Sequence, residues 1–498
     1  MAFPHTQALW PLSGAAQPTA PSTPAVVAVA DLRATNAAAV LAVVRSADPH
    51  PRLSELAQAT SLSRPTVEAI VEELADCGLI EAAPALSARG QRSPGRPARR
   101  FRFRAHAGFV VGVDVRPRSV TACLADLDGE PVVVRRRTVR ADLAGAARAR
   151  TVTSLIQEAM AEAAIDPARV WAATVGTPGL VDRANARVRK ADNLPTWADT
   201  DIAGILRELL HCPVAVENDA NLAALGEQWR GVGRARVAPR GGFERERTAD
   251  GRRTHEWSPE PPAGGGRSER PAQPSGERPA APAGLRATAS VGERSQDRPC
   301  EPSGEGSGAA GGRMVDEMVF VLLGERLGAG VITGGRLLRG HHGAAGEIGF
   351  IRFPGPSGTR GSSAPLGSAG SPDDPGLEPL PAAVVAAAAA GEADAVAAVE
   401  SYGRRLAEGI APVLLALDPA LIVIGTGQFP NPETAPAADL LLAAARRHAR
   451  TLLVDPPHWR LSALGDDGVL TGAVRFALSS VEVVLRTRPT SLAARARE

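Results

Sequence analysis

A carboxylate, an amide and a second carboxylate stand in a row at Glu217, Asn218 and Asp219, between an apolar strand and a predicted helix. The carboxylates would lie beside the positive end of that helix, where backbone N–H groups are unpaired. An amide offers both a donor and an acceptor, so the set suits the hydroxyl groups of a sugar. An Asn-Asp pair is also typical of a plain helix cap, and both interpretations stay open at this point.

A run of arginines between residues 86 and 106 carries a second kind of chemistry, and it contains no acidic residue. Its members are Arg89, Arg92, Arg96, Arg99, Arg100, Arg102 and Arg104. Guanidinium groups gathered on one hairpin predict a phosphate-binding surface whose affinity falls steeply with salt. Arg96 lies in a narrow Pro-Gly-Arg-Pro tip, from which it could reach into a minor groove. The alternative is a solvated run of charge on an ordinary hairpin.

The residues in front of this hairpin predict a winged helix-turn-helix. Two short amphipathic helices are joined at residues 59–61, and Ser63 and Pro65 suit the start of the second helix. That helix has a buried stripe at helical spacing, formed by Val67, Ile70, Val71 and Leu74. Its N-terminal face offers Arg64 and Thr66 to a major groove.

Because the helix pair and the acid-free hairpin occur in this order, we expect residues 31–105 to bind double-stranded DNA. The expected contact residues are Ser63, Arg64, Thr66, Arg92, Arg96, Arg99 and Arg100.

Composition limits the other classes of function. The 498 residues predict two to four domains, and a net charge of only +2 confines the basic surface to the hairpin. The four cysteines show no CxxC or CxC spacing, so we expect neither a disulfide framework nor a cysteine zinc site. We recognise no signal peptide and no membrane-spanning run, and we therefore expect a cytoplasmic protein with no membrane partner.

Beyond residue 106, apolar strands alternate with amphipathic helices, which predicts an α/β architecture. The expected strands are 109–115, 120–126, 131–139, 170–175, 213–217, 318–323 and 421–425, and the expected helices include 142–164, 219–229 and 392–417. Three segments lack the apolar residues to order themselves, and we expect them to be disordered: 1–30, 234–313 and a shorter one near 354–375. The α/β domain therefore comprises residues 106–233 and 314–498.

Six blocks in this domain resemble, in order, those of the ROK family of sugar kinases and transcriptional repressors. They are VGTPGLVD (175–182), DNLPTW (192–197), VENDANLAALGE (216–227), RGHHGAAGEIGF (339–350), LDPALIVIGTG (417–427) and ALGDDGVLTGA (463–473). The resemblance implies two actin-like (ribonuclease H-like) α/β lobes around a cleft, behind a winged helix-turn-helix. It also implies that Asp219 matches the base that takes a proton from the sugar hydroxyl in the kinases. Asn218, Glu347 and Glu378 match sugar contacts.

The chain departs from the kinases of that family in both phosphate loops. Their DxGGT turn is replaced by a stretch with Arg116 and Pro117, which loses both glycines and one N–H donor. Their GTGxGxG loop contains Glu325 here, a negative charge near the triphosphate. We therefore expect no ATP binding and no cofactor.

The zinc site of the family is also altered, because its histidine is Phe350 and its cysteine cluster is missing. Two neighbouring histidines, His341 and His342, have no cysteine partners. We expect no structural metal.

These observations together predict a transcriptional regulator, a repressor, that senses a sugar or sugar phosphate and acts as a homodimer or homotetramer on a two-fold operator. In it Asp219 would be a vestige of the kinase base. One alternative is an ATP-dependent sugar kinase with a fused DNA-binding domain, which the survival of Asp219 favours and the phosphate loops oppose. Another is a regulator that responds to a protein partner, which Phe350 and the missing cysteines favour.

Overall fold

The computed structural model describes most of the predicted elements. The described residues are 29–83, 99–182, 184–234, 314–324, 327–351, 353–354, 377–429 and 432–492, and all belong to one unit of the chain. Most of the segments that we expected to be disordered lie outside these residues, as do the hairpin tip with Arg92 and Arg96, and Glu325 of the second phosphate loop.

The N-terminal elements form the predicted winged helix-turn-helix. They are α1 (Val29–Ser46), α2 (Leu53–Thr60), α3 (Arg64–Asp76) and the antiparallel strands β1 (Ile80–Ala82) and β2 (Phe101–Phe103). The Ser63 hydroxyl caps α3 by accepting the N–H of Thr66 at 3.3 Å, and Pro65 lies in the first turn. The four residues of the predicted stripe are the buried residues of α3.

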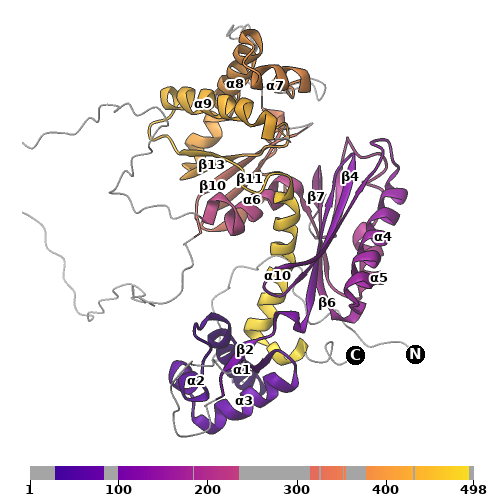
Figure 1. Ribbon diagram of the computed structural model, residues 1–498, viewed down its shortest axis with the longest axis vertical. Coiled ribbons are helices and arrows are strands. Elements are labelled where there is room, and N and C mark those ends of the chain that lie inside the picture. Colours follow the sequence, from indigo (N-terminus) through magenta and orange to yellow (C-terminus); the bar gives the residue numbers. More distant parts are fainter. Residues whose placement is uncertain are drawn as a thin grey trace, which may run out of the picture. The chain divides into compact units, whose positions relative to one another are not determined.

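The first α/β lobe is built on a five-stranded sheet with the order β5-β4-β3-β6-β9. Its strands are β3 (Phe109–Val115), β4 (Ser119–Asp126), β5 (Pro131–Thr138), β6 (Val170–Thr177) and β9 (Val214–Asn218). The first three are antiparallel, and β6 and β9 run parallel to β3. Helices α4 (Gly145–Ala163) and α5 (Ile202–Leu210) cover one face (Figure 1), and β7 (Leu180–Asp182) pairs with β8 (Arg187–Lys190) beside the sheet.

The second lobe repeats this topology with the order β12-β11-β10-β13-β14. Its strands are β10 (Met318–Leu323), β11 (Leu327–Thr333), β12 (Arg336–Leu338), β13 (Leu421–Ile424) and β14 (His458–Leu461). Three strands are again antiparallel, and two run parallel to the central one. Helices α7 (Ala382–Ala389), α8 (Ala393–Leu417) and α9 (Ala435–Leu452) pack on this lobe. Two copies of one topology are the fold that the resemblance implied.

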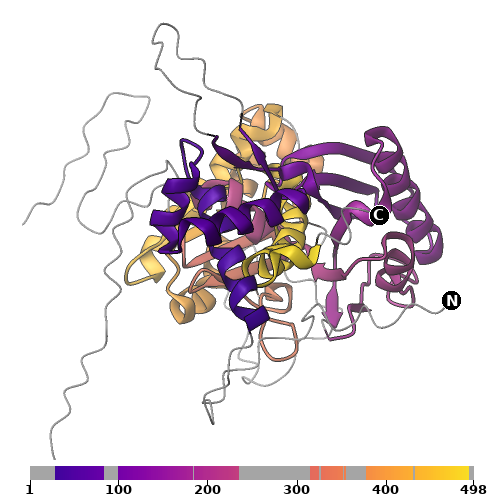
Figure 2. The same ribbon diagram turned by 90° about the horizontal axis from the view of Figure 1, so that it is seen from below.

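Two helices lie between the sheets and connect the lobes (Figure 1): α6 (Asp219–Arg230) and α10 (Gly468–Thr487). Helix α6 follows the first sheet but packs on β10 and β11, whereas α10 follows the second sheet and packs on β3 and β6. By length and composition alone the stretch 465–487 could cross a membrane, but most of it is buried in the core. The C-terminal half of α10 shares a hydrophobic cluster with α1. In Figure 2 the yellow helix lies beside the indigo helices of the N-terminal domain.

Candidate functional site

A cleft of about 450 Å³ lies at the carboxyl ends of strands from both sheets. Its walls come from the residues that follow β3, β6, β9, β10, β13 and β14. In open α/β sheets this edge is where ligands bind, because loops from several strands converge there. The predicted ligand residues are therefore expected to line this cleft.

Three of the four predicted ligand residues line this cleft, namely Asn218, Asp219 and Glu347. Glu378 is exposed and is not among the described residues of the cleft wall. Glu378 was predicted by matching a short stretch to the family pattern. A long gap separates that stretch from the preceding motif, so the spacing did not fix which residue matched.

Asn218 serves as a helix cap, as the plainer interpretation of the motif predicted. Its Oδ1 accepts the N–H of Asn221 at 3.2 Å, and its Nδ2 donates to the Gly179 carbonyl at 3.1 Å. Both ends of the amide are thus held, and Asn218 presents a fixed edge to the cleft. Asp219 accepts the N–H of Ala220 with Oδ1 at 2.9 Å, and Oδ2 has no hydrogen-bond partner in the described part of the chain.

The environment of Asp219 favours its protonated form. Burial raises the pKa of Asp219 to about 6, and the nearby carboxylates of Asp114 and Glu347 add to the rise. The N–H of Ala220 and the Arg116 guanidinium act in the opposite direction. A carboxyl group with a pKa near neutrality can accept a hydrogen bond or a proton from a sugar hydroxyl under physiological conditions.

Glu217, the first member of the motif, lies behind the cleft wall and is buried. Its Oε2 accepts from Nε of Arg339 at 2.7 Å, and its Oε1 accepts from Nδ2 of Asn221 at 3.0 Å and from the N–H of Asn218 at 3.1 Å. This ion pair joins the end of β9 to the segment after β12, and it fixes the start of α6. Glu217 therefore positions the two residues that follow it.

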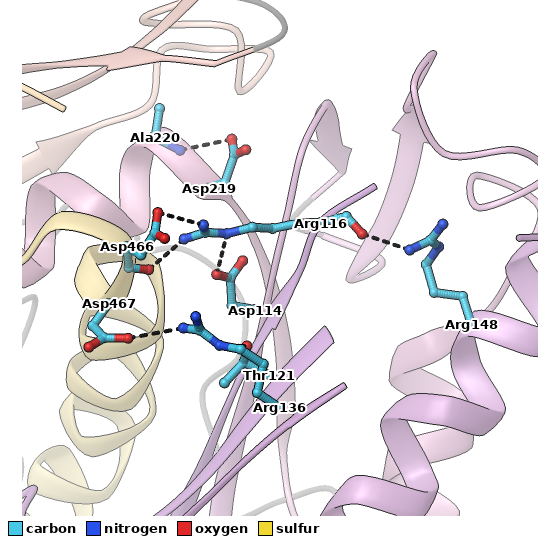
Figure 3. Close-up of polar contacts among 9 residues, drawn as sticks. All are labelled: Asp114, Arg116, Thr121, Arg136, Arg148, Asp219, Ala220, Asp466 and Asp467. Atoms are coloured by element: carbon cyan, nitrogen blue, oxygen red, sulfur yellow. Dashed lines mark hydrogen bonds and ion pairs between the residues drawn. The ribbon is translucent and has the colours of Figure 1, made fainter. Parts of the chain in front are cut away.

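The turn after β3 is held by two arginines (Figure 3). Arg116 donates from Nε to the buried Asp114 at 2.7 Å and from a terminal nitrogen to Asp466 at 3.0 Å. Arg148 of α4 is fully buried and donates to the carbonyls of Arg116 at 2.6 Å and of Pro117 at 3.1 Å. Burial raises the pKa of Asp114, an effect that Arg116 opposes. Sequence reasoning found the altered turn but missed Arg148 and Asp466, whose partners are distant in the chain.

This turn does not fit a bound triphosphate. The N–H of Arg116 already donates to the Ser119 carbonyl at 2.9 Å, and Pro117 has no N–H. The carbonyls of both residues point to Arg148, so the turn offers no backbone donors at these two positions. Phosphate loops bind through such donors.

The residues near Phe350 do not fit a zinc ion either. Phe350 lines the cleft, is 62% exposed and has no ligand atom. His341 and His342 are exposed and contact each other with ring centroids 4.5 Å apart. Across the residues that the structure describes, no group of three or more His, Cys, Asp or Glu side chains could hold a metal ion.

The predicted DNA-binding residues divide into exposed and internally paired ones. Ser63, Arg64, Thr66 and Arg99 are exposed, and the Ser63 and Thr66 hydroxyls bond each other at 2.7 Å. Arg100 instead donates to the His50 carbonyl and lies 3.5 Å from Glu55.

The remaining described arginines of the hairpin, Arg102 and Arg104, pair with Glu81 of β1, Arg102 donating at 2.7 Å. The stretch 86–106 contains no acidic residue, but the neighbouring strand β1 contributes Glu81 as an acidic partner. Among the hairpin arginines that the structure describes, Arg100, Arg102 and Arg104 are therefore paired within the protein, and Arg99 is exposed.

The sequence matches two protein families in the expected order. Residues 110–235 and 305–372 match the ROK family, and residues 34–84 match the IclR helix-turn-helix domain. The xylose repressor of Caldicellulosiruptor bescii is 22% identical over 178 residues, which are 36% of this chain and 43% of the repressor. The glucokinase of Thermotoga maritima is 42% identical over 60 residues, 12% of this chain and 19% of the enzyme. The chain thus matches less than half the length of these curated relatives.

The fold has a counterpart among solved structures. The crystal structure of a ROK family transcriptional regulator, a homologue of the E. coli MLC protein, superposes with a TM-score of 0.58 at 17% identity. The superposition covers 93% of this chain and 100% of that chain, so the two share their fold over nearly their whole lengths. The paired lobes, the cleft motifs and the helix-turn-helix lead to one conclusion: this chain carries a ROK family domain, with an IclR-type helix-turn-helix in front of it.

Proposed function

We propose that this protein is a DNA-binding transcriptional regulator, a repressor, whose kinase-like domain senses a sugar and does not phosphorylate it. The observation that carries the proposal is the path of α10. Its start lies at the cleft, where Gly465, Asp466 and Val469 are wall residues, and its end lies in the core of the helix-turn-helix. A twenty-residue helix is about 30 Å long, so one rigid element connects the ligand site to the DNA-binding domain.

A sugar in this cleft would act by changing the closure of the lobes and thereby the position of α10. Val481, Val484 and Leu485 on α10 share a hydrophobic cluster with Val40 and Leu41 on α1, so a movement of α10 is transmitted to the DNA-binding helices. For near-complete switching, the sugar must bind one conformer more tightly by roughly 5 kcal/mol. The name of the xylose repressor relative supports a sugar as the effector.

The repressor would work in the cytoplasm as a homodimer or homotetramer. A two-fold axis places two copies of α3 in successive major grooves, about 34 Å apart, and implies an operator of matching symmetry. The sugar kinase alternative is supported by Asp219, whose pKa of about 6 suits a base, but the turn at Arg116 and Pro117 opposes ATP binding. We therefore expect no sugar-dependent release of ADP from ATP.

The DNA-binding proposal is tested with two separate variants, in which either an exposed arginine or a paired arginine is replaced by alanine. The probe is a duplex that the full-length protein selects from a randomised pool. We expect Arg64→Ala to weaken binding at least tenfold, because Arg64 is exposed at the N-terminus of α3. Arg102→Ala is the matched control, since Arg102 is bound to Glu81 and should change affinity less than threefold.

The salt dependence of DNA affinity also separates the two variants. Affinity falls as salt rises, and each lost phosphate contact makes the slope of log affinity against log salt shallower by about one. We therefore expect a shallower slope for a variant that has lost a phosphate contact and an unchanged slope for the control. If Arg64→Ala binds the selected duplex as tightly as the unmodified protein, the assigned DNA surface is wrong. If the unmodified protein selects no sequence at all, the repressor proposal itself fails.

A further inference from the structure

The turn between β4 and β5 is held from two sides by arginines that belong to different parts of the molecule. On one side lies Arg45, in the last turn of α1 in the helix-turn-helix. On the other side lies Arg230, the last residue of α6. The turn, residues 127–130, is at the end of the first sheet opposite the cleft, because Asp126 pairs with Phe109 at the start of β3. It therefore connects the back of the first lobe to the DNA-binding domain.

Arg45 binds the turn through a hydrogen bond and an ion pair. One of its terminal nitrogens donates to the Leu127 carbonyl at 3.3 Å and lies 3.6 Å from the Asp128 carboxylate. The guanidinium lies over the ring of Phe103 in β2, 4.5 Å from its centroid, which helps to fix its direction. The N–H of Leu127 donates to the Ala105 carbonyl at 3.0 Å. Both backbone polar groups of Leu127 are therefore bound by the helix-turn-helix and the segment that leaves it.

Arg230 binds the opposite side of the turn. One of its terminal nitrogens donates to the Asp128 carbonyl at 3.1 Å and to Oε1 of Glu130 at 2.7 Å. Its guanidinium lies 4.1 Å from the centroid of the Trp229 ring. Gly129 has a φ of 80°, and a Cβ atom there would lie 2.3 Å from the same ring. The end of α6 thus contacts the turn through a cation, two acceptors and an aromatic face.

The turn between the two arginines is internally braced. Oδ1 of Asp126 accepts the N–H of Asp128 at 3.0 Å and the N–H of Glu130 at 2.9 Å. Such side-chain bonds to the following backbone fix the conformation of a turn. The side chains of Arg45 and Arg230 are only 26% and 25% exposed, so water screens their contacts weakly. A displacement at Arg230 is therefore passed to Arg45 rather than absorbed by the turn.

Helix α6 connects this turn to the ligand cleft. Asn218 and Asp219 line the cleft at the start of α6, and Arg230 ends the twelve-residue helix about 18 Å away. By its packing α6 belongs with β10 and β11 of the second lobe, whereas the turn belongs to the first sheet. The buried Glu227 fixes α6 there by accepting the N–H of Leu464, which follows β14, at 3.0 Å. A relative movement of the lobes therefore displaces Arg230 against the turn.

We infer that the β4–β5 turn couples the ligand cleft to the helix-turn-helix, with Arg230 and Arg45 as the residues that position it from its two sides. This coupling rests on the proposed regulatory function, and it adds a second route to the contact between α10 and α1. The second route is polar, and it begins at the other helix that connects the lobes. Because Arg230 and Arg45 act in series, the loss of either one interrupts it.

The first experiment measures the affinity of the full-length protein for the selected duplex with and without xylose or glucose. We expect Arg230→Gln and Arg45→Gln each to reduce the sugar-dependent change in DNA affinity about threefold, while sugar affinity in the absence of DNA stays the same. The double variant should reduce the change no further, because two contacts in series are not additive. If both single variants keep the full change, the turn does not couple the two sites.

Two other arginines provide matched controls, because each loses an ion pair that lies outside the turn. Arg33 is also on α1 but pairs with Glu73 of α3 at 2.7 Å. Arg475 is on α10 and pairs with Glu482 of the same helix at 2.9 Å. We expect Arg33→Gln and Arg475→Gln to keep the full sugar-dependent change. If they reduce it as much as the turn variants do, the loss reflects general destabilisation, and the assigned route is wrong.

The second experiment needs no sugar, because coupling between two sites is reciprocal. We expect the selected duplex to slow amide hydrogen exchange at residues 127–130 and in the last turn of α6, and Arg45→Gln to remove the slowing in α6. Unchanged exchange in α6 of the unmodified protein overturns the assigned route, even if a sugar alters DNA affinity through α10. Slowed exchange in α6 without a response to either sugar supports the route and contradicts only these sugars as effectors.

Discussion

Asp219 combines a position in the cleft wall with an unfavourable environment for its own charge. Its pKa is raised to about 6 by burial and by the carboxylates of Asp114 and Glu347, whereas the ordinary value is 3.8. A carboxyl whose pKa is higher in the folded state contributes stability that is present below pH 3.8 and is lost as the pH rises through 6. At neutral pH the folded protein therefore carries an ionised group that destabilises it, as is common at ligand sites.

We predict that Asp219→Asn raises the melting temperature above pH 6 and abolishes the response to sugar. Asparagine keeps the acceptor for the Ala220 N–H and removes the charge. The gain should be a few degrees at pH 8, should shrink between pH 6 and pH 4, and should vanish below pH 4. Differential scanning calorimetry across this range measures it. A difference between variant and parent that stays constant with pH would show that Asp219 does not titrate as described.

At the level of single residues, the residues predicted from continuous motifs, Asn218, Asp219 and Glu347, line the cleft. Asn218 and Asp219 could be placed because a strand ends and a helix begins beside them. The partnership of Arg116 with Asp466 could not, because 350 residues separate them. The same holds for Arg102, whose acidic partner Glu81 lies outside the arginine-rich stretch. Charge patterns along a chain reveal donors, but only the fold reveals which donors are already occupied.

Among the elements, runs of β-branched residues predicted strands well. The strands expected at 109–115 and 318–323 are β3 and β10, with the same bounds. The prediction missed β11 and β14, because glycines interrupt the pattern of the first and the second has only four residues. It also missed α10, although the buried residues of its C-terminal half recur at helical spacing: Val474, Ala477, Leu478, Val481, Val484 and Leu485.

The crossing of α6 and α10 depends on glycines that let the two backbones approach. A Cβ atom at Gly472 would lie 1.7 Å from the Leu222 carbonyl oxygen, so an alanine there forces the helices apart. We predict that Gly472→Ala lowers the free energy of unfolding by about 3 kcal/mol or prevents folding. Gly468→Ala is the control on the same helix, because its nearest neighbours would be 3.8 Å away. That variant should be neutral or gain up to about 1 kcal/mol from helix propensity.

Chemical denaturation of both glycine variants measures these changes. Equal stabilities would mean that the helices can separate without loss, and α10 would then be a poor transmitter of movement between the cleft and the DNA-binding domain.

For the whole molecule, the resemblance to a family predicted the two lobes. It did not predict that α10 packs on α1 and so links the lobes to the helix-turn-helix. The link joins opposite ends of the chain: Val481 and Leu485 near the C-terminus pack in one cluster with α1 at the N-terminus. No local pattern can reveal a contact between segments so far apart. The link matters because an effector can change operator affinity only as far as its binding energy is coupled to the DNA-binding domain.

This coupling can be separated from both binding events by changing the contact between α10 and α1. Val481 is buried in the shared cluster, whereas Val483, two residues on, is 39% exposed. We predict that Val481→Ala leaves sugar affinity in the absence of DNA within about threefold but reduces the sugar-dependent change in operator affinity at least fivefold. Val483→Ala should keep the full change. Because coupling is reciprocal, the effect of operator DNA on sugar affinity must fall by the same factor, which calorimetry measures independently. If both variants retain the full response, sugar binding reaches the DNA-binding domain by a route other than α10.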